Sequence, residues 1–338
     1  MTREYKHCGI GRAPAADDTD WMSMISFLDF EKPIAELEAR IAELRATADG
    51  SDLDIDGEIT RLEKKSTGML AATYAKLTPW QKTQVARHPQ RPHLVDYIRL
   101  AFSDFVPLAG DRTFGEDAAI IGGFATLDGR KVMLIGHEKG HDTPSRVKHN
   151  FGSAKPEGYR KAIRLMELAS KFGLPIVTLV DTAGAFPGVE AEERGQAEAI
   201  ARSTEACLAL EVPMVAAIVG EGGSGGAIAI AAANTVLMLE HAVYSVISPE
   251  GASSILWRTA DKAADAATAM KVTAQDLLGL KVIEGIVPEP TGGAHRDPAA
   301  TARTLADALG RELDTLAGLS RQDLVRQRED RFLAIGSL

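Results

Sequence analysis

Hydrophobic residues recur at intervals of three and four positions near the start of the chain, which is the spacing of amphipathic helices. The polar stretch ADGSDLDIDGE, residues 48–58, separates two such stripes. Their members are Ile34, Leu37, Ile41 and Leu44 in the first stripe and Ile59, Leu62 and Met69 in the second. The pattern predicts a helical hairpin over about residues 31–77, which serves packing or partner contact rather than chemistry.

Short apolar runs alternate with helical patterns through the middle of the chain, and this alternation predicts an α/β core. The predicted strands lie at residues 131–136, 175–181, 213–219 and 235–240, and the predicted helices at 159–172 and 195–210. From about Pro298 to Leu333 the chain returns to a helical pattern. One face of it carries Leu305, Leu309, Leu313 and Leu316.

Two stretches, residues 173–188 and 211–226, repeat one pattern: a helix end, a proline, a strand and a glycine loop. Pro175 and Pro213 mark equivalent points in the two. Such a repeat predicts stacked strand and helix units. Their glycine loops are expected to open on one side, where ligands bind in α/β proteins.

The second of these loops has five glycines in the seven positions Gly220–Gly226. Glycine costs about 1 kcal/mol against alanine in a helix, so the cluster indicates that side chains would obstruct a ligand or another backbone. From Val212 to Leu239 the only charged residue is Glu221. Because the glycines interrupt this apolar run in the middle, a buried strand followed by a buried helix is favoured over a membrane span.

Composition narrows the classes of function. A chain of 338 residues with 45% hydrophobic content can bury a large core, and its net charge of -9 argues against a general nucleic-acid binder, which needs a basic face. Cys8 and Cys207 are too few for a disulfide framework or a cysteine zinc site within the chain. Residues 1–23 lack the apolar segment of a secretory signal, so we expect a disordered leader on a cytoplasmic protein.

One candidate motif is the dinucleotide fingerprint GxGxxG. Gly220, Gly222 and Gly225 satisfy it between a predicted strand and a predicted helix, and Glu240 stands at the end of the next strand. The dinucleotide interpretation gives no role to the loop after the preceding strand, which counts against it. An NAD-dependent dehydrogenase is kept as an alternative hypothesis.

The same residues also match GxSxG, with Ser224 as a nucleophile between Gly222 and Gly226. A triad would then need a downstream acid and a histidine such as His295. The acids available are Asp261, Asp265 and Asp276, and the sequence around each predicts a helical, solvated context. Ser224 is explained more simply as a small residue that permits close packing.

HEKGH, residues 137–141, matches the HExxH zinc-protease pattern, which needs both imidazoles on one helical face. The run follows a predicted strand, contains Gly140 and reaches Pro144 three residues later. This setting predicts a loop, so we interpret the match as chance and expect no metal in this chain.

Residues 137–164 carry seven Lys or Arg against three Asp or Glu, within an acidic protein. The run is either a solvated loop and helix start or an anion site. In the second interpretation Arg146, Lys148 and Lys155 meet a phosphate or carboxylate. Both interpretations stay open.

A remaining role for the glycine turn needs no reactive side chain. Backbone N–H groups at a helix start, with no β-carbons around them, can stabilise an oxygen that gains negative charge. The loss of one such donor typically costs about 3 to 4 kcal/mol of transition-state stabilisation. The loop Asp181–Gly188 would form the opposite wall of the cleft.

Seven blocks of sequence, in this order, resemble the family of carboxyltransferase α subunits of bacterial acetyl-CoA carboxylase. They are FLDFEKPIAELE, LTPWQKTQVARHPQRP, PEGYRKAIRLMELA, DTAGAFPGVEAEERGQ, GEGGSGGAIAI, YSVISPEGASSILW and PEPTGGAHRDP. The likeness runs from about Phe27 to the C-terminus and is far more specific than any single glycine motif. It displaces the dehydrogenase and hydrolase interpretations.

The resemblance implies an α/β, crotonase-like (ClpP/crotonase) fold, a β-β-α superhelix with an N-terminal helical hairpin and C-terminal helices. On this basis we expect four regions. They are a leader at 1–23, a hairpin and interaction region at 24–105, a carboxyltransferase core at 106–290 and a C-terminal helical region at 291–338.

The reaction implied by the resemblance is transfer of CO2 from carboxybiotin to acetyl-CoA, which gives malonyl-CoA for fatty acid synthesis. Biotin would be held on a separate biotin carboxyl carrier protein and carboxylated by biotin carboxylase. The implied partner is a β subunit with a four-cysteine zinc ribbon, in an α2β2 assembly. A crotonase-like scaffold that binds partners without turnover is the non-enzymatic alternative.

The resemblance also assigns roles within the glycine turn. The backbone N–H groups of Gly225 and Gly226 are expected to hold the biotin ureido oxygen, with Gly222, Gly223 and Ala227 as neighbouring binding positions. Gly184 and Ala185 would line the cleft from the other loop. The resemblance does not choose among the carboxyl group, the carrier and CoA phosphates as the target of the basic run.

Overall fold

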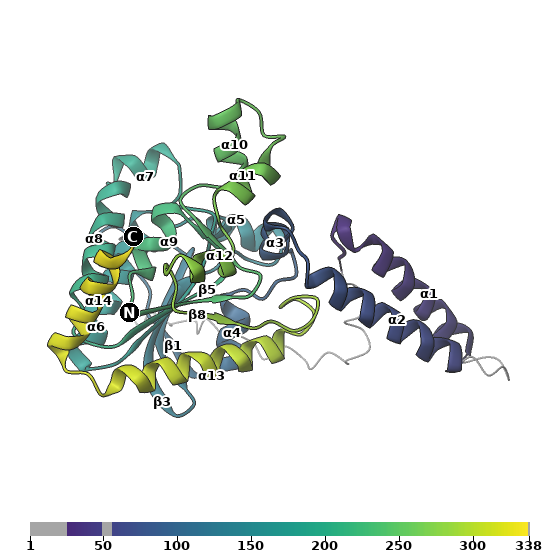
Figure 1. Ribbon diagram of the computed structural model, residues 1–338. Helices are drawn as coiled ribbons and strands as arrows, with labels where there is room; N and C mark the ends of the chain where they lie inside the picture. Colours follow the sequence, from purple (N-terminus) through teal and green to yellow (C-terminus); the bar gives the residue numbers. More distant parts are fainter. Residues whose placement is uncertain (1–25, 49–55, 337–338) are drawn as a thin grey trace, which may run out of the picture.

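The computed structural model describes residues 26–48 and 56–336. The expected leader at 1–23 lies outside the described residues. The described chain forms a body built on one sheet, from which a pair of helices extends (Figure 1).

The sheet has the strand order β1-β2-β3-β4-β5-β6-β8, and β7 pairs with the end of β5. Strand β2 is antiparallel to both of its neighbours, β1 and β3, and the pairs from β3 onward are parallel. The strands are β1 (Ser103–Pro107), β2 (Ile120–Leu127), β3 (Arg130–His137), β4 (Ile176–Thr182), β5 (Met214–Gly223), β6 (Thr235–Leu239), β7 (Val243–Ser245) and β8 (Gly285–Val287).

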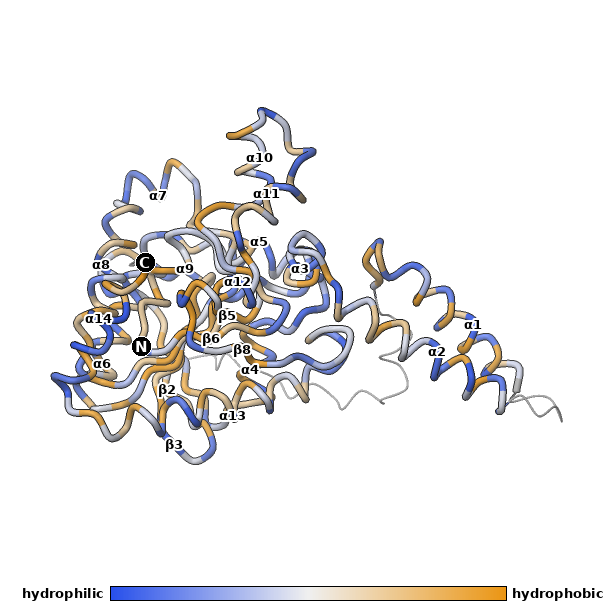
Figure 2. The backbone as a smooth tube through the Cα atoms, viewed as in Figure 1, coloured by the Kyte–Doolittle hydropathy of each residue, from blue (hydrophilic) through white to orange (hydrophobic). Residues whose placement is uncertain are grey.

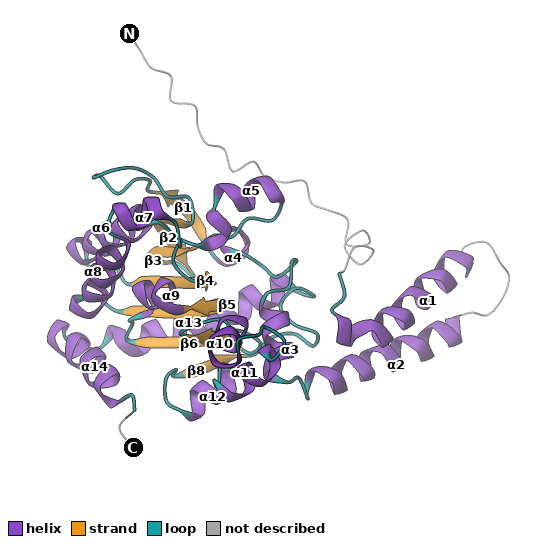
Figure 3. Ribbon diagram, turned by 90° about the horizontal axis from the view of Figure 1, so that it is seen from above, coloured by secondary structure: helices purple, strands orange, loops and turns teal. Residues whose placement is uncertain are grey.

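Helices lie on both sides of this sheet (Figure 3). Helices α6 and α9 pack on the strands from one side, with α8 against them, and α13 packs on β5 and β8 together with α4. The helices of the body are α3 (Pro79–Ala86), α4 (Leu94–Ala101), α5 (Thr143–Lys148), α6 (Pro156–Phe172), α7 (Val189–Glu193), α8 (Gln196–Ala209), α9 (Ser224–Ala231), α10 (Pro249–Trp257), α11 (Ala263–Ala269), α12 (Ala274–Gly279), α13 (Pro298–Ala317) and α14 (Arg321–Ala334).

The central strands are apolar because helices cover both of their faces. Every residue of β4 and β5 is buried, and Figure 2 shows hydrophobic residues concentrated along the strands. The predicted strands at 131–136, 175–181, 213–219 and 235–240 are confirmed as β3 to β6. The run from Val212 to Leu239 contains the buried strand β5 and the largely buried helix α9, as expected, and ends with the buried strand β6. Within the described residues, no helix has both the length and the apolar character that crossing a bilayer requires.

The repeat seen in the sequence is a structural repeat. β4 and β5 are adjacent and parallel, with Ile176 opposite Met214, and the N–H of Ile176 donates to the carbonyl of Pro213 at 2.8 Å. The prolines that precede the two strands therefore occupy equivalent places. The two glycine-containing loops leave the sheet at the same edge, as the sequence predicted.

The predicted N-terminal hairpin is confirmed as α1 (Lys32–Ala48) and α2 (Asp56–Tyr74), which pack against each other. Ile34, Ile41 and Leu62 of the two apolar stripes are buried. The hairpin projects from the body (Figure 1), so much of its surface has no contact with the sheet. The division of the chain into four regions stays a prediction.

The C-terminal region forms two helices where the sequence pattern suggested one helical stretch. α13 ends at Ala317 and Ser320 caps α14, whose Asp323 N–H donates to the Ser320 hydroxyl at 3.2 Å. The buried Arg328 holds α14 to the body, because its guanidinium donates to backbone carbonyls in the last turn of α8 and directly after it. These acceptors are Leu208 O at 3.0 Å, Leu210 O at 2.8 Å and Val212 O at 3.3 Å.

Candidate active site

The two glycine-containing loops meet where β4 and β5 end. Thr182 at the end of β4 pairs with Gly222 near the end of β5, so the segments 183–188 and 223–226 leave the sheet side by side. The carboxyl ends of neighbouring parallel strands are the usual place for a ligand site in an α/β sheet.

Close backbone contact explains the missing side chains. A β-carbon on Gly223 would overlap the carbonyl of Ala183, and one on Gly226 would lie 2.7 Å from both Ala185 N and Gly184 C. Because backbone cannot move aside as a flexible side chain can, neither position has room for alanine. The predicted neighbours Gly184 and Ala185 are thus in direct contact with the turn.

Helix α9 begins within the glycine turn, and Gly223 at its N-cap has no side chain to occupy the first-turn N–H groups. Such N–H groups have no partner inside a helix and carry the positive end of its dipole. Ser224, the first residue of α9, has a φ of 51°, a left-handed conformation that non-glycine residues seldom adopt.

An apolar cavity of about 480 Å³ opens beside this helix start. It is lined by Ser224, Gly225, Ile228, Tyr244, Ser245, Val246, Met270, Leu277 and Val282. Gly225 is at its wall, whereas Gly226 and Ala227 are buried within the turn and α9. Gly222 lies under the Tyr244 ring, since a β-carbon there would be 2.8 Å from Tyr244 Cδ2.

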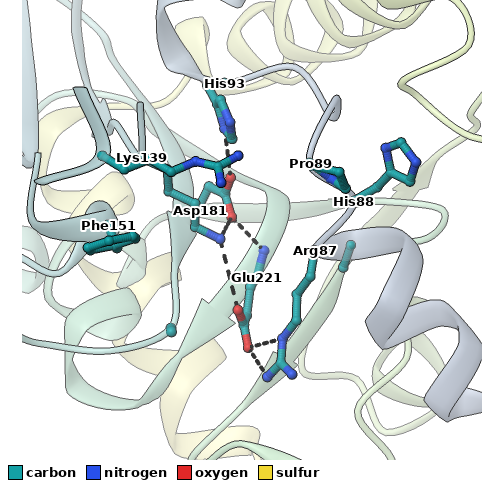
Figure 4. Close-up of a pocket in the computed structure, with 11 residues that line it drawn as sticks. Arg87, His88, Pro89, His93, Lys139, Phe151, Asp181 and Glu221 are labelled. Atoms are coloured by element: carbon teal, nitrogen blue, oxygen red, sulfur yellow. Dashed lines mark hydrogen bonds and ion pairs between the residues drawn. The ribbon is translucent and has the colours of Figure 1, made fainter. Parts of the chain in front are cut away.

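A second cavity, of about 260 Å³, lies at the same strand ends and is called the polar cavity because charged residues contribute to its lining. Its lining includes Arg87, His93, Lys139, Asp181 and Glu221 (Figure 4). Lys139 Nζ is 2.6 Å from Asp181 Oδ1, and Arg87 Nε donates to Glu221 Oε1 at 3.0 Å. The two carboxylates of these ion pairs belong to Asp181, near the end of β4, and to Glu221, within the glycine turn.

Asp181 is charged despite full burial. Burial by itself would raise the pKa of this carboxyl, but the Lys139 ammonium and the His93 ring outweigh it and hold the pKa of Asp181 well below its usual value. A buried carboxylate that is held ionised by a lysine is typical of a functional or a positioning group.

The three basic residues of the predicted anion site lie in different surroundings. Arg146 lines the polar cavity and its Nε donates to the carbonyl of Gly140 at 3.3 Å. Lys155 pairs with Glu190 at 2.7 Å and lies over the Phe186 ring. Lys148 ends α5 and lines neither of these two cavities. A shared anion site made by all three stays a prediction.

The loop predicted for HEKGH is confirmed. His137 ends β3, and the residues from Glu138 to Asp142 are not helical, so the two imidazoles do not share a helix face. His137 is buried, and burial lowers its pKa to about 4, so the ring is neutral at pH 7. In the segments that the structure describes, no group of three or more His, Cys, Asp or Glu is placed to hold a metal ion.

The sequence alone did not predict the ion pairs formed by Asp181 and Glu221. Arg87 and Glu221 are 134 positions apart, and a local pattern cannot pair residues at that separation. The available signal was a charged residue directly after or within a buried apolar strand. Asp181 and Glu221 both meet that description, and burying a charge requires a partner.

Comparison with known proteins gives one consistent family. A family described as acetyl co-enzyme A carboxylase carboxyltransferase-like matches residues 27–336. A curated protein of Erythrobacter litoralis named acetyl-coenzyme A carboxylase carboxyl transferase subunit alpha is 73% identical over 313 residues, covering 93% of this chain and 100% of that protein. A protein of the same name from Zymomonas mobilis is 67% identical over 314 residues, again covering 93% and 100%.

Solved structures agree on the fold. A Pseudomonas malonate decarboxylase hetero-tetramer in complex with coenzyme A gives a TM-score of 0.57 at 17% identity, over 71% of this chain and 94% of that one. The transcarboxylase 12S structure gives 0.53 at 21% identity, over 66% and 42%. The predicted α/β crotonase-like fold is thereby confirmed.

Proposed function

The chain belongs to the family of acetyl-coenzyme A carboxylase carboxyl transferase α subunits, and from this premise we propose which of its groups carry the chemistry. Together with a β subunit, it transfers a carboxyl group to acetyl-CoA and gives malonyl-CoA, a step of fatty acid synthesis. The dehydrogenase alternative has no support in the comparisons.

In this proposal the backbone N–H groups of Gly225 and Gly226 stabilise negative charge on an oxygen of the carboxyl donor. Both belong to the first turn of α9, where the N–H groups have no partner inside the helix. The helix dipole adds to their effect, and donors already fixed in position need no reorganisation as the charge develops. The single observation that carries the proposal is a helix start made of bare backbone beside a cavity.

The carboxyl donor implied by the family is carboxybiotin on a separate carrier. When bound, it supplies a carboxyl group from its ureido ring, whose oxygen gains negative charge as that group leaves. The cavity beside Gly225 fits such a ring, because Ile228, Val246 and Leu277 give it apolar walls while the helix start supplies polar N–H groups. The proposed donors are flanked in the turn and in α9 by Gly222, Gly223 and Ala227. The other loop contacts the turn through Gly184 and Ala185.

The test uses the assembled enzyme. The assay follows the reaction in reverse. Purified chain and β subunit are mixed with a free biotin analogue, which accepts the carboxyl group, and with malonyl-CoA, and the formation of acetyl-CoA is measured. We expect turnover that needs both subunits and the biotin analogue. An assembled complex that forms no acetyl-CoA would contradict the proposal and would favour a scaffold without turnover.

Ser224→Ala is expected to leave kcat within about threefold of the parent enzyme, because the proposed donors to the developing negative charge are backbone N–H groups and not this hydroxyl. The hydroxyl is exposed at the cavity, and the N–H groups of Gly225 and Gly226 stay in place. The assay above measures kcat and KM for the variant. A loss as complete as that of a nucleophile variant would show that the hydroxyl takes part.

The wider assembly is also a proposal. We expect an α2β2 core in which the zinc ribbon belongs to the β subunit, working with the biotin carboxyl carrier protein and biotin carboxylase. The net charge of -9 and the glycine turn favour small-molecule and protein partners over nucleic acid. Arg146, Lys148 and Lys155 stay candidates for attracting a carboxylate or phosphate. The mass of the complex in solution and zinc analysis of each subunit test the assembly.

A further inference from the structure

Strand β5 is interrupted by a bulge directly before the glycine turn. Val180 of β4 pairs with Ile218 of β5, but Thr182 pairs with Gly222. Asp181 alone therefore faces the three residues 219–221 of β5. Bulges of this kind redirect the chain that follows them and are frequent next to active sites.

Two buried charged side chains replace the hydrogen bonds that the strand pairing loses here. The N–H of Glu221 donates to Asp181 Oδ1 at 2.9 Å, and Arg91 Nε donates to the carbonyl of Val219 at 2.7 Å. Gly220 lies between them, and a β-carbon on it would overlap the Asp181 carboxylate. The carboxylate thus fills the space above the bulge and fixes its backbone.

The Asp181 carboxylate is itself held from two sides. Lys139 Nζ, from the segment after β3, is 2.6 Å from Oδ1, and His93 Nδ1, at the N-cap of α4, is 3.6 Å from Oδ2 (Figure 4). The Glu221 carboxylate accepts from Arg87, which also donates to Glu250 of α10 at 2.6 Å, and its Oε2 is 3.9 Å from Lys139 Nζ. The bulge is therefore tied to the elements on both sides of it.

We propose that Asp181 and Lys139 are positioning residues for the carboxyl transfer: the carboxylate fixes the β5 bulge, and the bulge sets where the N–H groups of Gly225 and Gly226 lie. Neither side chain needs to touch the substrate. Only four residues separate Gly220 from Gly225, so a change of direction at the bulge moves the helix start directly. Displacement of a positioned donor by a fraction of its hydrogen-bond length lowers the rate more than it lowers binding. The inference rests on the function proposed above.

Two single variants test the charge pair. Asp181→Asn keeps an oxygen for the Glu221 N–H but leaves Lys139 with only the more distant Glu221 carboxylate, at 3.9 Å, and Lys139→Met leaves the buried Asp181 charge with only the His93 ring beside it. We expect each to lower kcat by about tenfold or more, with KM for malonyl-CoA changed less than about threefold, as for loss of an interaction that acts in the transition state.

Two double variants separate positioning from simple stability. Asp181→Asn with Lys139→Met removes both charges but keeps the oxygen that accepts the Glu221 N–H, so kcat is expected to recover to within about threefold of the parent. Asp181→Leu with Lys139→Met removes the charges and also the acceptor, and kcat is expected to stay at least about tenfold low. Equal kcat values for the two double variants would overturn the proposal.

A matched control carries the same change at a remote site. Asp111 is buried and accepts the N–H groups of Thr113, Phe114 and Gly115 in the segment between β1 and β2. Asp111→Asn is expected to lower the unfolding temperature without changing kcat. An equal loss of kcat in this control would show that the loss at Asp181 comes from general destabilisation of the fold, and it would overturn the proposal.

The parent complex, assayed in parallel, distinguishes this inference from its premise. An inactive parent complex would overturn the proposed function and this inference with it. An active parent complex with Asp181→Asn at full kcat would overturn the positioning role alone.

Discussion

Gly226→Ala is expected to lower kcat of the assembled enzyme by about 10² to 10³, the usual loss when one backbone donor to a developing oxyanion is displaced. The added β-carbon would lie 2.7 Å from Ala185 N and Gly184 C, both of which are backbone atoms. One of the two loops must therefore shift, and the Gly226 N–H moves with it. The malonyl-CoA assay with a free biotin analogue measures the effect.

Gly225 and Gly310 provide the comparisons. A β-carbon on Gly225 would meet only the Ile200 side chain, at 3.3 Å, so Gly225→Ala is expected to keep the fold and to act through the cavity, by raising KM for the biotin analogue. Gly310→Ala makes the same change in α13, where nothing lies within 4 Å, and is expected to be silent. Full kcat in Gly226→Ala would contradict the backbone mechanism.

Glu289→Ala is expected to lower the free energy of unfolding by about 3 to 5 kcal/mol, because it leaves a buried arginine without its counter-charge. Arg91 and Glu289 are 1% and 0% exposed and are joined by two hydrogen bonds, of 2.6 and 3.0 Å. Glu289 also accepts the N–H groups of His241 and Ala294. Denaturant unfolding of the purified chain measures the change.

The matched control is an exposed ion pair. Arg202→Ala breaks contacts with Glu198 and Glu205 on the surface of α8, and the unfolding midpoint is expected to stay unchanged. A Glu289→Ala variant that is as stable as the Arg202→Ala variant would contradict the importance assigned to the buried pair.

The contribution of Glu289 depends on pH in a definite direction. Burial alone would raise the pKa of this carboxyl, but the Arg91 guanidinium outweighs burial and lowers the pKa to about 2. A carboxyl whose pKa is depressed in the folded state stabilises the protein fully above its unfolded pKa of about 4.3 and loses that contribution as the pH falls toward the folded value. The stability difference between the parent and Glu289→Ala should therefore shrink between about pH 5 and pH 2.

Local pattern was sufficient for much of the framework. The strands β3 to β6, the hairpin of α1 and α2 and the equivalence of Pro175 and Pro213 follow from periodicity and repetition along the chain. The glycine turn was also evident, since five glycines between two apolar runs indicate close backbone approach. The short helices α7 and α10 were not predicted, because few residues define their periodicity.

The fold class, the family and the turn that carries the proposed donors could be recognised from residue order alone, because they depend on short-range order and on long blocks shared with relatives. The folded chain was needed to show that Gly225 faces a cavity while Gly226 packs against Gly184 and Ala185. It alone joined Asp181 to Lys139 and Glu221 at the bulge of β5. The physical reason is that a buried charge is stabilised by whichever partner folding brings within a few ångströms, and separation along the chain contains no record of that distance.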